Sequence, residues 1–359
     1  MNRANAIFPK ALVVAAFAML VVLPASAQEL RFFRIGTGSI SGVYFPTGGL
    51  IASAISHPPG ASLCGQGGSC GVPGLVAVAQ ATRGSVVNVR HIGAGRIESA
   101  LVQADVAYFA YRGVGAFAGK KAVPGLRAIA NLYPEAVHVV VRERSSIRSI
   151  KDLADKRVSL DLKGSGTRTT AILVLKGFGL EPKSLRQVNS QIGPAVDRVK
   201  SGRIDAFFFT GGFPAPSITR LAEDVPLRLL PITGKSAIAI QKADRFLIPV
   251  TIPAATYGIK GEVQTLAVAA LWAVSEKVSE ELVYGITRAL WHPITRKILD
   301  HGPAAIRGIR LENALKGVVI PLHKGARRYY REKGLLKAPA PTPKSTPKST
   351  PKSTPKPKP

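Results

Sequence analysis

Residues 34 to 49 read RIGTGSISGVYFPTGG and join a short apolar strand to a second apolar segment, Leu50 to Ile55, that can form a helix. The small residues between them leave the backbone N–H groups of the turn open to a ligand. The sequence therefore predicts a strand, a glycine-rich loop and a helix in that order. The alternative interpretation is an ordinary strand-to-helix connection without a ligand.

A second glycine-rich segment has the same setting. Residues 161 to 167, DLKGSGT, follow a strand-like run at 157–160 and precede a helix-like run at 169–178. The two loops are about 130 residues apart. Together they predict two half-sites that face each other, although each loop taken alone is also compatible with an ordinary turn.

The part of the chain between its two ends alternates strand-like and helix-like runs, which predicts an α/β fold with parallel sheets and helical crossovers. The predicted strands are 86–92, 106–108, 128–132, 137–141, 157–160, 206–209 and 228–231, and the predicted helices are 48–55, 97–103, 169–178, 195–200 and 217–222. About 310 residues are enough for two such lobes. Ligands of open α/β sheets bind at the carboxyl ends of strands, where both glycine-rich loops fall. We therefore expect a site between two lobes.

The first 27 residues have the pattern of a secretory signal peptide. Arg3 and Lys10 precede thirteen mostly apolar residues, and Ala25-Ser26-Ala27 supplies a cleavage pattern. A membrane anchor is the alternative, but a span needs about 20 apolar residues. The mature protein is expected to begin at Gln28 and to be periplasmic.

The other end, residues 338 to 359, repeats Pro-Lys-Ser-Thr three times. It has no large apolar residue to bury, so we expect a disordered tail. Its five lysines are compatible with weak contact to an anionic membrane or wall polymer, although such a tail is more often only a solvated appendage.

The net charge of +28 raises the question of a nucleic-acid partner. The basic residues are scattered, no recognition motif occurs, and a secreted protein meets little nucleic acid, so no nucleic-acid partner is expected. A field that attracts small anions fits better. A generally basic habitat or proteome would also explain the charge.

The only two cysteines, Cys64 and Cys70, lie in a glycine-rich segment. Their spacing can meet disulfide geometry in an oxidising compartment. A metal pair is the alternative, but His57 is the only histidine in that segment and four ligands are usual. We expect a disulfide and no metal.

The candidate ligand-binding residues come from the two loops and the strand ends near them. A carboxylate at residues 164–167 would meet free N–H groups, two hydroxyls and the positive end of a helix dipole. An acid in the first lobe is expected either to pair with a ligand ammonium group or to cap local backbone. The candidates are Thr37, Ser41, Gly42, Tyr44, Ser85, Asn88, Asp105, Gly164, Ser165, Gly166, Thr167, Phe208 and Gly211.

Enzyme motifs are missing from the sequence. The glycines at 36, 38 and 42 do not have dinucleotide spacing, and neither a Gly-Lys-Ser/Thr phosphate loop nor a Gly-x-Ser-x-Gly elbow occurs. Binding without catalysis and without a cofactor is therefore expected.

The order of several short blocks resembles the TAXI family of extracytoplasmic solute receptors, which belong to TRAP transporters. The blocks include residues 35–38 with 42–46, 84–88, 101–107, 126–135, 150–158, 164–167, 202–208 and 321–326. The resemblance implies a periplasmic-binding-protein-like (type II) fold with two lobes that close over the solute. It implies lobe one at 31–140 plus 238–330 and lobe two at 141–237, with crossings at 137–142 and 227–233.

The same resemblance implies a function. Characterised members of the TAXI family bind small carboxylates such as glutamate or related acids and deliver them to a TRAP membrane subunit. The expected partners are thus a small anionic or zwitterionic solute and that permease. A sensory receptor of the same fold, presenting its ligand to a signalling protein, is the alternative.

Overall fold

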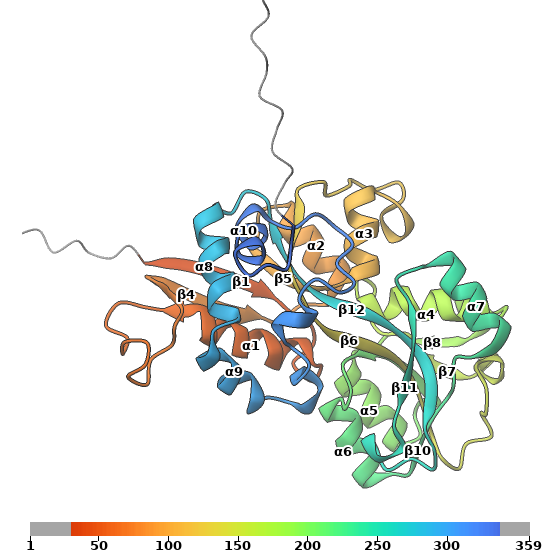
Figure 1. Ribbon diagram of the computed structural model, residues 1–359. Helices are drawn as coiled ribbons and strands as arrows, with labels where there is room; N and C mark the ends of the chain where they lie inside the picture. The colour runs from red at the N-terminus through yellow and green to blue at the C-terminus, as the bar shows by residue number, and fades with distance from the viewer. Residues whose placement is uncertain (1–29, 338–359) are drawn as a thin grey trace, which may run out of the picture.

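The computed structural model describes residues 30–337, so the predicted signal peptide and the predicted tail lie outside the described residues. Within them, one ten-stranded sheet passes through the whole molecule (Figure 1). Its main path is β4 (Leu75–Gln80), β1 (Arg31–Gly36), β5 (Ser99–Gln103), β12 (Val263–Ser275), β6 (Leu126–Arg142), β9 (Ala206–Gly211), β7 (Arg157–Ser159) and β8 (Arg186–Val188).

Two further strands extend the sheet at its long central pair. Strand β10 (Leu227–Leu229) pairs with β6, and β11 (Ile248–Ile252) pairs with β12, both antiparallel. A separate two-stranded sheet joins β2 (Ser56–His57) and β3 (Val72–Pro73). The β1–β4, β1–β5, β7–β8 and β7–β9 pairs are parallel, whereas β12 pairs antiparallel with both β5 and β6.

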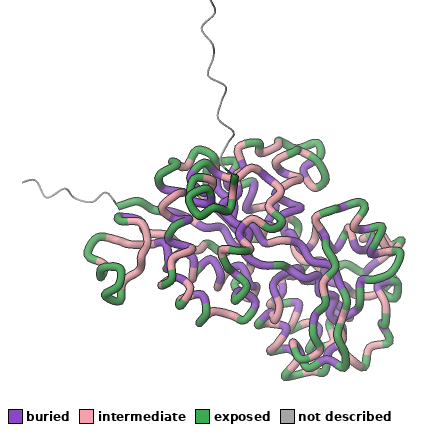
Figure 2. Tube along the Cα trace, viewed as in Figure 1, coloured by how far each residue is buried: buried purple, intermediate pink, exposed green. Residues whose placement is uncertain are grey.

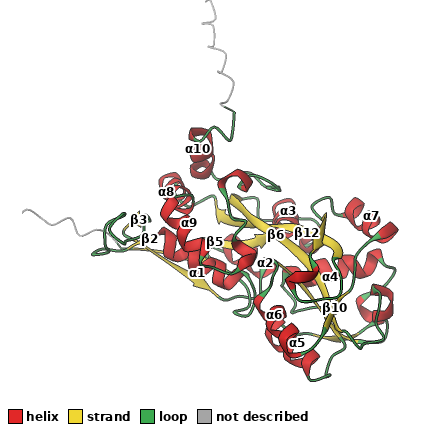
Figure 3. Cartoon of the chain, turned by 60° about the horizontal axis from the view of Figure 1, so that its bottom comes forward, coloured by secondary structure: helices red, strands yellow, loops and turns green. Residues whose placement is uncertain are grey.

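Helices cover both faces of the sheet, and each face has its own apolar core (Figure 3). On one face lie α1 (Tyr44–Ile55), α5 (Ile192–Lys200), α6 (Pro216–Asp224), α8 (Glu280–Leu290), α9 (Pro293–Asp300) and α10 (Lys324–Glu332). On the other lie α2 (Ser85–Gly93), α3 (Ala104–Arg112), α4 (Gly166–Gly177) and α7 (Gly234–Ala243). Figure 2 shows buried residues along the central strands in both halves of the molecule.

Strands β6 and β12 are the structural link between the halves. Strand β6 has 17 residues and β12 has 13, and both run from the half with β1, β4 and β5 into the half with β7, β8 and β9 (Figure 1). In β6 nearly every residue is buried, which is expected for a strand covered on both faces. The expected α/β fold of the two-lobed, periplasmic-binding-protein-like type is confirmed.

Three of the expected elements were wrong. Residues 86–92 and 106–108 lie in helices α2 and α3 and not in strands, and residues 97–103 contain strand β5 and not a helix. All five residues of β5 are buried, and such a short apolar run has no periodicity that separates a strand from a helix. The expected strands at 128–132 and 137–141 are parts of one strand, β6.

The predicted lobe boundary at 237/238 falls inside α7, which packs against α4 of the second half. The division of the chain into two moving lobes stays a prediction. In the described part of the chain, every helix is too short or too polar to cross a membrane.

Candidate functional site

Four helices begin around one cavity between the two halves. Helices α1 and α2 belong to the half with β1, and α4 and α5 to the half with β7 (Figure 1). The first residues of all four, Tyr44, Ser85, Gly166 and Ile192, line the cavity. The volume inside it that is open to the centres of water-sized molecules is about 60 Å³.

The convergence of helix starts gives the cavity a positive potential. The first N–H groups of an α-helix have no partner within the helix, and the helix dipole adds positive partial charge at this end. Each helix here has 9 or 12 residues, and none of the four has an acidic residue in its first turn. The arrangement therefore favours an anion in the cavity.

Two buried side chains in the cavity wall have polar atoms without a hydrogen-bond partner among the described residues. They are Oε1 of Gln103, a residue 2% exposed, and Oγ1 of Thr210, a residue 6% exposed. An unpaired buried polar atom costs about 1–3 kcal/mol. A polar solute in the cavity would pair with these atoms and remove that cost.

Glu135 supplies a buried carboxyl group to the same cavity. The Tyr44 hydroxyl donates a hydrogen bond to Glu135 Oε2 at 2.7 Å. Burial raises the pKa of Glu135 well above its ordinary value, although the bond from Tyr44 acts in the opposite direction. The raised pKa favours the protonated form of Glu135, which can itself donate a hydrogen bond.

Asp161 and Arg83 are the other titratable groups on the wall. Burial raises the pKa of Asp161 to about 6, while the N–H of Leu162, 2.6 Å from Oδ1, acts to lower it. Arg83 is exposed at the rim. At neutral pH the side chains therefore supply one cation and one acid that is largely ionised, besides the four helix ends.

The structure brings seven of the predicted ligand-binding residues together in the cavity wall. They come from both glycine-rich loops and from the strand ends beside them, and they are Gly42, Tyr44, Ser85, Ser165, Gly166, Thr167 and Gly211. Three of their hydroxyl groups also have structural roles, and the first of them is Ser85 Oγ, which accepts from the N–H of Gln103. Ser165 Oγ accepts from the N–H of Arg168 and caps α4, and Thr167 Oγ1 accepts from the N–H of Thr210.

Six other predicted residues lie outside the cavity wall: Thr37, Ser41, Asn88, Asp105, Gly164 and Phe208. Asn88 donates to the carbonyl oxygens of Thr37 and Leu101, and Thr37 Oγ1 donates to the Gln80 carbonyl. These bonds tie α2 to β1, β4 and β5.

Asp105 is fully buried and faces Asp244. Its Oδ1 accepts from the N–H of Val106, and its Oδ2 has no partner among the described residues. Burial, and secondarily the charge of Asp244, raise its pKa to about 7. Asp105 therefore caps local backbone, which was the alternative expected for it, and the acids on the cavity wall are Glu135 and Asp161.

Phe208 packs in the core on the other face of the sheet, while its neighbour Phe209 lines the cavity. Alternate residues of a strand point to opposite faces, so the predicted residue, Phe208, lies on the wrong face of the strand. Ser41 and Gly164 lie where the two halves touch: the Ser217 hydroxyl donates to the Ser41 carbonyl at 2.6 Å, and Val87 N–H donates to the Gly164 carbonyl at 3.1 Å.

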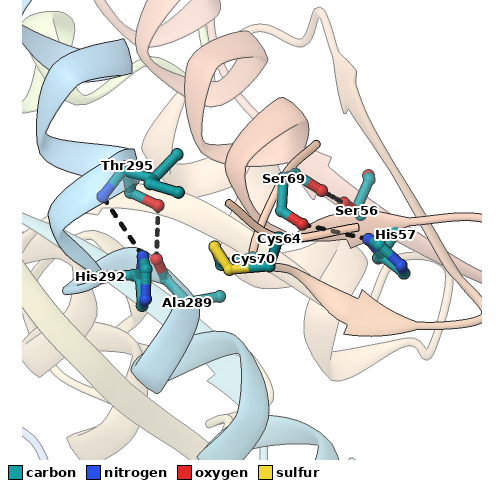
Figure 4. Close-up of a disulfide and its surroundings, with 9 residues drawn as sticks. Ser56, His57, Cys64, Ser69, Cys70, Ala289, His292 and Thr295 are labelled. Carbon is teal, nitrogen blue, oxygen red and sulfur yellow. Dashed lines mark hydrogen bonds between the residues drawn. A yellow bond between two sulfur atoms is a disulfide. The ribbon is translucent and has the colours of Figure 1, made fainter. Parts of the chain in front are cut away.

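Cys64 and Cys70 form the expected disulfide, with their Cα atoms 4.8 Å apart (Figure 4). His292 lies beside them, and its Nδ1 accepts from the N–H of Ile294 at the start of α9. The two sulfur atoms are bonded to each other, so neither is a thiolate that could bind a metal ion.

The family of the chain is shown by a match to one protein-family model. The model of the NMT1-like family matches residues 35–334. The chain belongs to the NMT1-like family. This family is broader than the TAXI family that the sequence resembles, so the match does not give the type of transporter.

Several solved structures are similar to this chain at low sequence identity. The alkanesulfonate-binding protein SsuA from Xanthomonas axonopodis pv. citri, bound to MOPS, is 16% identical, with 86% of this chain and 93% of that chain covered and a TM-score of 0.44. The periplasmic aliphatic sulphonate binding protein SsuA from Escherichia coli is 13% identical, with 86% and 94% covered and a TM-score of 0.39. A binding protein component of an ABC phosphonate transporter from Pseudomonas aeruginosa is 11% identical, with 79% and 80% covered and a TM-score of 0.48.

Proposed function

We propose that this NMT1-like protein is an extracytoplasmic solute-binding receptor that holds a small anion between its two halves and delivers it to a membrane transporter. The observation that carries the proposal is the cavity where four helices begin beside two unpartnered buried polar atoms. Such a site suits binding without catalysis, and the sequence suits export to the periplasm.

The solute class follows from the groups in the cavity wall. An oxyanion can accept hydrogen bonds from the helix N–H groups, from Thr210 and from neutral Glu135, while a hydroxyl or amide of the solute can donate to Gln103 Oε1. The interior of the cavity is narrow, about 60 Å³ by the measure given above, so the solute is small. We propose a short carboxylic acid, with its carboxylate at the start of α4.

The type of membrane transporter is a separate part of the proposal. The resemblance to TAXI receptors supports a TRAP-type secondary transporter, whose membrane subunit would receive the solute. Neighbouring coding regions give a direct check. A large multispanning permease encoded beside this chain would support transport, and a histidine kinase in its place would support sensing and contradict this part of the proposal.

The binding proposal is tested by thermal shift and calorimetry of the mature protein against a panel of small carboxylates, sulfonates, phosphonates and amino acids. A ligand present at 100 times its dissociation constant adds about 2.7 kcal/mol of stability. We expect at least one small carboxylate to produce this shift with one-to-one stoichiometry. The proposed solute class is wrong if only sulfonates or phosphonates bind, and the function is wrong if no member of the panel binds.

A further inference from the structure

A second pocket, separate from the cavity, is lined by basic side chains. It lies along the outer side of the contact between α2 and α4, and by the same measure its volume is about 560 Å³. We call it the basic groove and define it by Arg83, Arg90, Lys120, Lys163 and Arg168. The residues that line it include no aspartate or glutamate in the described part of the chain.

The charges of the basic groove are not neutralised within the described residues, where no ion pair includes any of the five side chains. Arg168 donates to two neutral oxygens, Oδ1 of Asn189 and Oε1 of Gln187, and Lys120 Nζ donates to a backbone carbonyl. Other basic residues of this protein do pair with acids, as Arg157 does with Asp205 and Arg228 with Glu143. The groove is therefore a place where five basic side chains gather without an acid among the described residues that line it.

The basic groove also crosses the boundary between the two halves. Arg83 and Arg90 come from the α2 side, while Lys163 and Arg168 come from the α4 side (Figure 1). The hydrogen bond from Val87 N–H to the Gly164 carbonyl joins two residues that line the groove. Like charges on the two sides repel each other when the halves approach, unless an anion lies between them.

We propose that the basic groove is a second anion site, which binds a polyvalent phosphate-type oxyanion and bridges the two halves in their closed arrangement. Guanidinium and ammonium groups are the usual partners of phosphate oxygens, and charge-assisted bonds are the stronger ones. A polyvalent ion fits because the positive groups come from both sides. This site goes beyond the proposed solute cavity, with which it shares only Arg83 and Ser165 among the described residues.

The test uses the full mature chain and inorganic tripolyphosphate as the probe, without any solute for the cavity. Calorimetry at constant ionic strength compares wild type with the groove variant Lys120→Gln/Lys163→Gln. The matched control is Lys297→Gln/Arg331→Gln, which removes two exposed charges from α9 and α10. Melting temperatures of all three proteins check that they are folded.

We expect the groove variant to lose roughly two- to thirtyfold in tripolyphosphate affinity, the loss of two solvent-exposed charge pairs, while the control stays close to wild type. Equal losses in both variants would mean that only the net charge attracts the probe, and the proposal would be overturned. Vesicles of anionic phospholipid distinguish the source of the phosphate. Groove-dependent binding to vesicles without binding of tripolyphosphate would also overturn a site for a soluble ion.

Discussion

Glu135 is the residue whose protonation decides what the cavity can hold. Its buried carboxyl accepts from Tyr44 and has a pKa raised well above the ordinary value. A neutral acid can donate a hydrogen bond to a bound oxyanion, whereas an ionised one would repel it. The sequence contains Glu135 within an apolar run, but nothing in that run indicates which face of the strand it lies on.

Replacing Glu135 with glutamine tests this protonation state. Glutamine keeps an N–H donor at nearly the same place as the carboxyl group. We therefore expect Glu135→Gln to bind the solute within about threefold of wild type at pH 7. Loss of a charge-assisted hydrogen bond would instead weaken binding by about tenfold or more. In wild type, affinity should fall at alkaline pH as Glu135 ionises, and in the variant this fall should disappear. Calorimetry across pH measures both effects. A loss of tenfold or more at pH 7 would instead indicate an ionised Glu135 that pairs with an ammonium group.

Tyr44 gives a second test at the residue scale. Tyr44→Phe removes the hydroxyl that donates to Glu135 Oε2, so one carboxyl oxygen loses its buried partner. We expect solute affinity to fall by about 1–2 kcal/mol, roughly five- to thirtyfold. Thr47→Val, whose hydroxyl donates to the Val43 carbonyl within α1, serves as the control and should leave affinity unchanged. Unchanged binding by Tyr44→Phe would show that the Tyr44–Glu135 pair does not contact the solute.

Asp105 predicts a pH dependence of stability. Its pKa is about 7 in the folded protein against 3.8 as a free side chain, so the folded state holds a proton that the unfolded state releases between these values. Stability from this group is therefore complete below pH 4 and is lost as pH rises through 7, by at most about 4 kcal/mol. Asp105→Asn should raise the melting temperature at pH 8 and leave it nearly unchanged at pH 4. Equal effects at both pH values would contradict a protonated Asp105.

Helix α4 shows how an element can control closure of the cleft. A Cβ atom added at Gly166 would lie 2.0 Å from Gln103 Oε1 and 2.8 Å from Ser85 Oγ, both on the opposite half. The φ angle of Gly166 lies outside the positive range that disfavours other residues. The glycine is therefore required by the contact between the halves and not by the local backbone.

Gly166→Ala should thus block closure without harming the fold. We expect solute affinity to fall at least about tenfold, because Gln103 must move into the cavity or the halves must stay apart. The melting temperature without solute should stay equal or rise slightly, as alanine favours helices. Gly49→Ala in α1 is the matched control, since nothing lies within 4 Å of its added Cβ, and it should bind normally. Normal binding by Gly166→Ala would show that this contact does not control closure.

The disulfide belongs to the connection between β2 and β3, which lies at the opposite end of the molecule from α4 and α5 (Figure 3). Closing a loop between residues 64 and 70 stabilises the protein by about 2 kcal/mol in the chain-entropy model. Cys64→Ser/Cys70→Ser should therefore lower the melting temperature by a few degrees and leave solute affinity unchanged. Mass spectrometry after alkylation without reductant should find no labelled thiol in wild type, and two labels would contradict the bond.

The element scale also shows what could be inferred from sequence. The two glycine-rich loops in the sequence predicted the starts of α1 and α4, and residues of both loops line the cavity. The start of α5, at Ile192, was missed as part of the site. At α2 the prediction named Ser85, but as a residue at a strand end, because residues 86–92 have the composition of a strand. Only tertiary packing around buried Asn88 makes this segment a helix, and composition does not contain that information.

At the scale of the whole molecule, single hydrogen bonds cross the cleft beside the cavity. Among the described residues they include Val87 N–H to the Gly164 carbonyl, Gln191 Nε2 to the Thr82 carbonyl, and the Ser217 hydroxyl to the Ser41 carbonyl. Each contributes about 0.5–1.5 kcal/mol net. Like charges on the two sides of the basic groove oppose them. The balance between open and closed arrangements is therefore of the same size as the binding energy of a small solute, which can shift it.

We therefore predict that the solute closes the molecule. The expected moving bodies are residues 31–140 plus 238–330 and residues 141–237, with α7 moving with the second. Small-angle scattering of the mature protein should give a larger radius of gyration without solute than at saturation, because the open arrangement separates the halves about β6 and β12. Gly166→Ala should keep the larger radius even with saturating solute, and Gly49→Ala should contract like wild type. If wild type scatters identically with and without a solute that calorimetry shows to be bound, the cleft is rigid and closure plays no part in binding.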